Sequence, residues 1–159
     1  MLHSLTANKD SFHPVTFHPG LNLIIAKRLP ASSSMDTCNG LGKSTLIRVI
    51  DFCLGASTKG KDALPVDNLT DWEFTLELDI GSSKVKVSRR CNASDDVFVD
   101  GDVRGWPLEP DMELSDGRFL FSVENWRKIL GWGFYGAPSK LGRTCKLKGV
   151  YSDKKSTIR

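Results

Sequence analysis

The chain has 159 residues, of which 40% are hydrophobic and 26% charged, and it carries 22 basic and 19 acidic side chains. This composition is typical of a globular chain and excludes a fully disordered one. The longest purely apolar run, residues 23–26, is far shorter than the roughly 20 residues of a membrane-spanning helix. The opening residues do not resemble a secretory signal, so we expect a cytoplasmic protein without membrane contact.

Net charge and cysteine spacing give little further information about the class of protein. The net charge of +3 is too small to indicate nucleic-acid binding by itself. The four cysteines are widely spaced and form no Cys-x-x-Cys pair, which favours free thiols over a zinc site or a disulfide framework.

The first third of the chain predicts a buried strand followed by a helix. Residues 21–26 follow a Pro-Gly turn and are apolar at nearly every position, which is typical of a strand buried on both faces. The polar segment 27–36 predicts a loop. From Lys43 the apolar residues recur at helical spacing and Gly55 is a natural stop, so we expect a helix over about 43–54.

The middle of the chain predicts an antiparallel meander over 72–105. Apolar and polar residues alternate over 72–80, which indicates a half-exposed strand, and a return strand follows the turn at Gly81. Asp100-Gly101-Asp102 lies between apolar residues and predicts a second hairpin.

Two further elements are expected towards the end of the chain. Ser122 can cap a short helix that Gly131 would stop, within 122–131. Residues 143–159 hold six basic residues and one acidic residue, which predicts a flexible basic tail.

One segment carries chemistry, and it stands between the predicted strand and the predicted helix. Gly42, Lys43 and Ser44 fit the end of the phosphate-binding pattern G-x-x-x-x-G-K-[ST]. Small residues let successive backbone N–H groups wrap around phosphates, and a helix N-terminus adds about half a positive charge. Lys43 would bind the β- and γ-phosphates of ATP, and the Ser44 hydroxyl would ligate Mg²⁺. The expected nucleotide-binding residues are Asn39, Gly40, Leu41, Gly42, Lys43, Ser44 and Thr45.

The motif departs from the pattern at its start. Thr37 stands where the first glycine is expected, and a β-branched residue tolerates positive φ poorly. The loop then either enters the phosphate site by another path or is looser than usual. Cys38 would lie beside the phosphates, either as a thiol activated by the helix N-terminus or as an inert one. A glycine-rich turn that binds nothing would explain Gly40 and Gly42, but not Lys43 next to Ser44.

Around this motif the chain resembles the N-terminal head segment of ABC-type ATPases of the SMC and RecF class. The resemblance rests on residues 17–25 and 39–47. Over 36–39 and 48–55 the chain is similar to a bacterial subgroup that also lacks the first glycine, some of whose members are thought to serve in phage defence or DNA maintenance. It implies an α/β P-loop NTPase fold, present as a partial domain with an antiparallel β-meander lobe.

The resemblance also implies an organisation for the whole chain. Residues 1–159 would form a single N-terminal head lobe, with a strand pair, the P-loop and the first helix in 1–55. A Walker B acid and the Ser-Gly-Gly signature are not visible: residues 97–100 are the nearest Walker B candidate but run into a turn, and the chain has no glutamine for a Q-loop. In the family these parts come later, so we expect a fragment or a truncated member.

The implied partners follow from that family. Its heads sandwich two ATP molecules, so this chain would need ATP, Mg²⁺ and either a second head or the remainder of the parent ATPase, with DNA as a further partner. We expect the isolated chain to bind nucleotide weakly or not at all, and not to hydrolyse it, because no group to position the attacking water is visible.

Two other interpretations remain open. A small P-loop kinase would use arginines in a lid, but the arginines are scattered through the predicted meander: Arg89, Arg90, Arg104 and Arg118. A non-enzymatic module could bind DNA or a partner through basic residues on the return strand, which could equally form an ordinary solvated face: Lys84, Lys86, Arg89 and Arg90.

Overall fold

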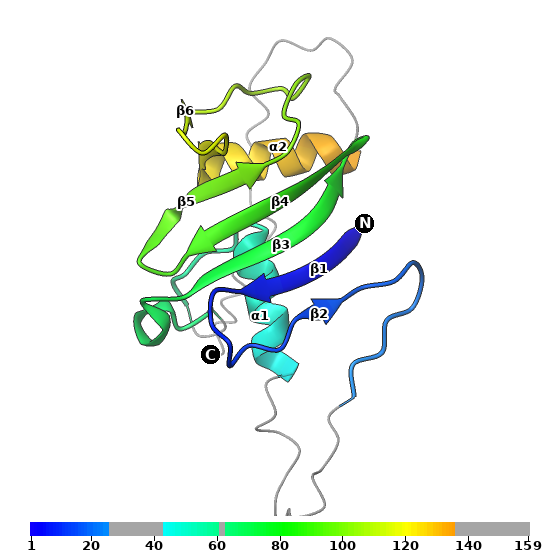
Figure 1. Cartoon of the computed structure of the whole chain (residues 1–159), viewed down its shortest axis with the longest axis vertical. Helices are drawn as coiled ribbons and strands as arrows, with labels where there is room; N and C mark the ends of the chain where they lie inside the picture. Colours follow the sequence, from blue (N-terminus) through cyan, green and yellow to red (C-terminus); the bar gives the residue numbers. More distant parts are fainter. Residues whose placement is uncertain (26–42, 61–62, 136–159) are drawn as a thin grey trace, which may run out of the picture.

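The computed structural model of the chain describes residues 1–25, 43–60 and 63–135 (Figure 1). These residues form seven strands, two α-helices and one short 3₁₀ helix, Val66–Leu69. The strands are β1 (Leu2–Ala7), β2 (Val15–Thr16), β3 (Glu73–Ile80), β4 (Ser83–Arg90), β5 (Ala93–Asp100), β6 (Met112–Glu113) and β7 (Phe119–Ser122). The helices are α1 (Lys43–Cys53) and α2 (Val123–Tyr135).

All seven strands form one sheet, and every pairing in it is antiparallel. The strand order is β2-β1-β3-β4-β5-β7-β6. The expected α/β P-loop fold is therefore wrong for the described residues, since that fold is built on a parallel sheet. The physical reason is visible in the connections: β3, β4 and β5 are joined by two-residue turns, which can link only antiparallel strands.

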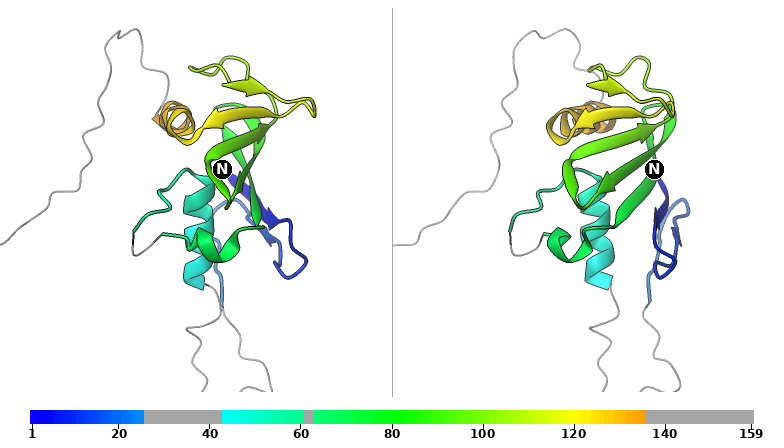
Figure 2. Two further views of the ribbon diagram at one scale, coloured as in Figure 1. Left: turned by 90° about the vertical axis from the view of Figure 1, so that its left-hand side faces the viewer. Right: turned by 60° about the vertical axis from the view of Figure 1, so that its left-hand side comes forward.

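Both α-helices cover the same face of this sheet (Figures 1 and 2). The core lies between the sheet and the two helices. Strand β3 alternates half-buried and buried residues, and its buried side chains face the helices. Helix α1 contributes Val49 and Phe52 to the core, and α2 contributes Trp126 and Ile129, all at most 1% exposed. The opposite face of the sheet is largely polar and carries cross-strand pairs such as Thr75 with Ser88.

Three expectations from the sequence agree with these elements. Helix α1 ends at Cys53, and Gly55 follows with φ of +92°, a conformation that glycine adopts without the strain a Cβ would bring. The alternating pattern over 72–80 corresponds to β3, and β4 returns after a turn at Gly81. Ser122 caps α2, since its Oγ accepts a hydrogen bond from Asn125 N at 3.3 Å.

Three expectations are wrong, and each failure has a local cause. Residues 21–25 form no strand and are exposed, because no described strand pairs with them and no layer covers them. Gly101 does not turn a hairpin: the chain leaves the sheet after β5, and β7 pairs with β5 instead. Helix α2 continues past Gly131 to Tyr135, because its far half packs on β3 through Gly133, next to Ile80.

The expected division of the chain into segments stays a prediction where the structure does not describe the residues. Residues 143–159, expected as a basic tail, lie outside the described residues. In the described part of the chain, neither α-helix is long and apolar enough to cross a membrane.

Candidate functional site

The first turn of α1 holds the three described residues of the predicted nucleotide site. Lys43 is the first helical residue and is half-buried, and Ser44 and Thr45 follow it as exposed side chains. No acidic residue stands in this first turn. The partial positive charge of the helix N-terminus is therefore not offset by a carboxylate of its own turn.

The rest of the predicted site lies outside the described residues. This holds for Asn39, Gly40, Leu41 and Gly42, and also for Thr37 and Cys38. The structure thus describes the helix that would follow the expected phosphate-binding loop, and the loop itself stays a prediction.

Large apolar side chains are exposed on α1 and in residues 21–25. Leu21 and Leu23 are 93% and 75% exposed, and Ile47 on α1 is 62% exposed. Contiguous exposed apolar patches often mark surfaces that bind a partner or another segment. The buried side of α1 is covered by β3 and β4, so Ile47 marks its uncovered side.

The other end of α1 is held by three side chains from distant parts of the chain. Arg89 on β4 donates hydrogen bonds to the carbonyl oxygens of Phe52 and Ala56. Trp126 Nε1 donates to Cys53 O at 3.1 Å, and Arg127 Nε donates to Gly55 O at 2.6 Å. These bonds satisfy the carbonyl groups that a helix leaves unpaired at its C-terminus. The last turn of α1 has no basic residue of its own, so the two arginines also supply the charge that its dipole favours.

Arg89 is the most buried charge among the described residues, with 1% exposure. Its guanidinium also donates to Ser94 O and lies 4.1 Å from the centroid of the Phe52 ring. Burial lowers the pKa of Arg89 to about 10, and the neighbouring charge of Arg127 adds to the lowering, so the group stays charged at neutral pH. Sequence reasoning placed Arg89 on an exposed basic strand, although alternation puts it on the same face as the apolar Val85 and Val87.

The four basic residues of β4 do not form one surface. Arg89 lies on the helix-covered face, whereas Lys84 and Arg90 are on the other face and pair with acids. Lys84 Nζ lies 3.1 Å from a Glu77 oxygen, and Arg90 Nε lies 2.7 Å from a Glu73 oxygen. This arrangement is that of a solvated, charge-paired sheet face, which was one of the two interpretations of these residues.

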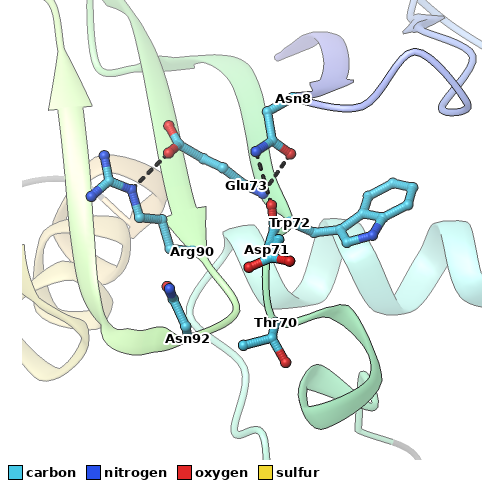
Figure 3. A pocket seen from close by; sticks show the side chains of 7 residues that line it. All are labelled: Asn8, Thr70, Asp71, Trp72, Glu73, Arg90 and Asn92. Carbon is cyan, nitrogen blue, oxygen red and sulfur yellow. Dashed lines mark hydrogen bonds and ion pairs between the residues drawn. The ribbon is translucent and has the colours of Figure 1, made fainter.

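A polar hollow lies at the start of β3 and the end of β4 and is drawn in Figure 3. Its side chains satisfy one another: Arg90 pairs with Glu73, and Asn8 donates to Asp71 O and accepts from the backbone N–H of Glu73. The Trp72 side chain points away from the Arg90–Glu73 pair (Figure 3). These contacts join the end of β1 to the start of β3, which gives the polar residues of this hollow a structural role.

The nearest candidate for a Walker B acid is not placed as such a site requires. Asp100 ends β5, an inner strand of the antiparallel sheet, and its side chain is exposed. Within the described residues, no group of three or more histidine, cysteine, aspartate or glutamate side chains is arranged to hold a metal ion.

The two described cysteines are free and buried. Burial raises the pKa of Cys53 to about 12 and that of Cys91 to about 11, although the charge of Arg89 acts in the opposite direction at both. These thiols therefore stay protonated and packed, which is not the state of a nucleophile or a metal ligand.

No protein-family model matches the chain, and no curated protein or solved structure matches it either.

Proposed function

We propose that the chain binds ATP with Mg²⁺ through residues 39–45, weakly when it is isolated, as the Walker A part of an ATPase similar to the SMC and RecF class, and does not hydrolyse ATP alone. One observation supports this above the others: α1 begins at Lys43, so the lysine of Gly-Lys-Ser stands in the first turn of an 11-residue helix. The chemistry of the motif needs that position, because the helix amides and the lysine ammonium then act on the same anion.

The proposal rests on the motif and its helix, and it does not require a parallel sheet within the described residues. The exposed apolar residues of α1 and of residues 21–25 support a partner for this chain. Leu21, Leu23 and Ile47 would be covered by the remainder of the ATPase or by a second head, which would also bring the acid and the signature. The resemblance adds a cytoplasmic role in DNA maintenance, repair or phage defence.

The absence of turnover follows from the groups that the chain offers. Lys43, Ser44 and backbone amides can bind and orient phosphates, but hydrolysis also needs a group that orients the attacking water. Asp100 lies at the exposed end of β5, and the described residues place no group of three or more histidine, cysteine, aspartate or glutamate side chains that could hold a metal ion.

The experiment is a calorimetric titration of the purified chain with ATP and Mg²⁺. Lys43→Ala should weaken binding by about tenfold or more, because it removes a charged hydrogen-bond donor to the phosphates. Lys86→Ala is the matched control, since it removes an exposed lysine of the open sheet face. Equal affinity of wild type and Lys43→Ala would refute the assignment of the site. A Mg²⁺-dependent ATPase rate that Lys43→Ala abolishes would refute the second half of the proposal.

A further inference from the structure

A second hollow lies at the C-terminal end of α1, between the segment after the helix, β4, the start of β5 and α2. Its volume is about 320 Å³, and the residues used below that line it are Ser57, Lys59, Arg89, Asp95 and Arg127. Binding sites for small molecules span roughly 300–1,000 Å³. Its volume lies at the lower end of this range, so the hollow suits a small ligand.

The charged side chains of this hollow are unbalanced. Three are basic, namely Lys59, Arg89 and Arg127, and Asp95 alone is acidic. Among the described residues, no carboxylate lies within 4.0 Å of any of the three cations. The C-terminal dipole of α1 offsets only about half a unit of charge, so a positive excess remains.

The donors of the hollow are only partly used by the protein. Arg127 Nε donates a hydrogen bond to Gly55 O. The two terminal nitrogens of Arg127 form no hydrogen bond within the described part of the chain. The buried Nε of Arg89 has no described partner. Ser57 fixes the turn that carries Lys59, because its Oγ accepts a hydrogen bond from Lys59 N at 3.1 Å. The ammonium of Lys59 is exposed and makes no described ion pair.

The two arginines also repel each other. The charge of Arg127 is one cause of the lowered pKa of Arg89, and the charge of Asp95 acts in the opposite direction with a smaller effect. A bound anion would reduce this repulsion. A phosphate group has the oxygen atoms to accept from a planar guanidinium and an ammonium at once, and Arg is well suited to such two-point contacts.

We propose that this hollow binds a small phosphate-bearing anion, with Arg127 and Lys59 as direct donors and Arg89 as a fixed buried charge behind them. The site is distinct from the nucleotide motif. The two lie at opposite ends of α1, which at ~1.5 Å per residue separates them by about 16 Å.

The test measures binding of inorganic phosphate, by ³¹P NMR titration at constant ionic strength, in the Lys43→Ala background. That background removes the main donor of the proposed nucleotide site, so the two proposals fail separately. Lys59→Ala combined with Arg127→Gln should weaken phosphate binding at least tenfold. Lys128→Ala, an exposed lysine of α2 that pairs with Glu124 outside the hollow, should change it less than twofold.

The remaining outcomes are equally decisive. Absence of saturable phosphate binding to the Lys43→Ala chain, or an equal loss in the Lys128→Ala control, refutes the proposal. A short DNA duplex serves as a second probe: binding of the duplex that the double variant abolishes, without binding of inorganic phosphate, also contradicts a small-anion site. Circular dichroism and the unfolding midpoint test whether the double variant is folded. Lys59→Ala alone changes an exposed turn and should still weaken phosphate binding measurably.

Discussion

Arg89 donates a hydrogen bond to the carbonyl oxygen of Phe52, and its guanidinium lies over the Phe52 ring at 4.1 Å from the centroid. A side chain from β4, the central strand of the sheet, therefore holds the C-terminal end of the helix whose first turn contains Lys43 and Ser44. The position of the proposed nucleotide site thus depends on a buried cation about three turns away from it.

The first prediction concerns this cation. Arg89→Met should lower the free energy of unfolding by about 2–4 kcal/mol, because the carbonyl oxygens of Phe52, Ala56 and Ser94 each lose a donor. Arg89→Lys should recover little, since an ammonium cannot reproduce the planar fork. Urea unfolding measures both. The control is Arg104→Met, whose side chain is 89% exposed and should leave the midpoint nearly unchanged. Equal effects at the two positions would contradict the role of Arg89.

A second prediction separates two tryptophans of α2. Trp126 is fully buried and donates to Cys53 O, whereas Trp132 is half-buried and has no hydrogen-bond partner among the described residues. Trp126→Phe should cost about 1–3 kcal/mol beyond the effect of Trp132→Phe, because it leaves a buried carbonyl without a donor. Thermal or denaturant unfolding of the two variants gives the comparison. A larger loss for Trp132→Phe would show that the contact to α1 is unimportant.

The two glycines inside α2 should respond in opposite directions to alanine. A Cβ at Gly131 would meet no atom within 4 Å, so Gly131→Ala should stabilise by about 0.5–1 kcal/mol through its helix propensity. A Cβ at Gly133 would lie 2.6 Å from Cγ2 of Ile80, and Gly133→Ala should destabilise because β3 or α2 must shift. The unfolding midpoints decide. Stabilisation by both changes would mean that α2 does not pack closely on β3.

The buried thiols predict a loss of stability in alkaline solution. Their folded pKa values, about 12 for Cys53 and about 11 for Cys91, lie above the ordinary value of 9.0. The unfolded chain therefore loses these protons first, and stability falls as pH rises above about 9. The slope approaches about 1.4 kcal/mol per pH unit for each thiol. Unfolding titrations from pH 8 to 10.5 should show this slope in the wild type and a flatter one in the Cys53→Ala/Cys91→Ala double variant. Identical slopes would contradict the prediction.

The sequence predicted the elements whose signal is local. The period of α1, its end at Gly55 and the alternation of β3 all depend on residues close together in the chain. The features that the sequence does not predict depend on contacts between segments that lie far apart in the chain. Residues 21–25 are as apolar as a central strand, yet burial requires a neighbouring strand that their own composition does not reveal.

The same distinction applies to the candidate sites. Gly42, Lys43 and Ser44 are adjacent in sequence, so the motif was visible, and the helix starts where the motif expects it. The hollow at the other end of α1 was not visible, because Lys59, Arg89 and Arg127 come from three separate segments. The alternation of β4 alone could have indicated that Arg89 faces inward.

The phosphate-binding role of residues 39–45 is best tested at the backbone itself. Amide chemical shifts of Gly40 and Gly42 should be followed in ¹H–¹⁵N spectra while ATP and Mg²⁺ are added to the wild-type chain and to Lys43→Ala. We predict large, saturable shifts at these two amides and at Ser44 in the wild type, and their loss in Lys43→Ala. Unchanged amides at Gly40 and Gly42 at millimolar ATP would contradict the proposal.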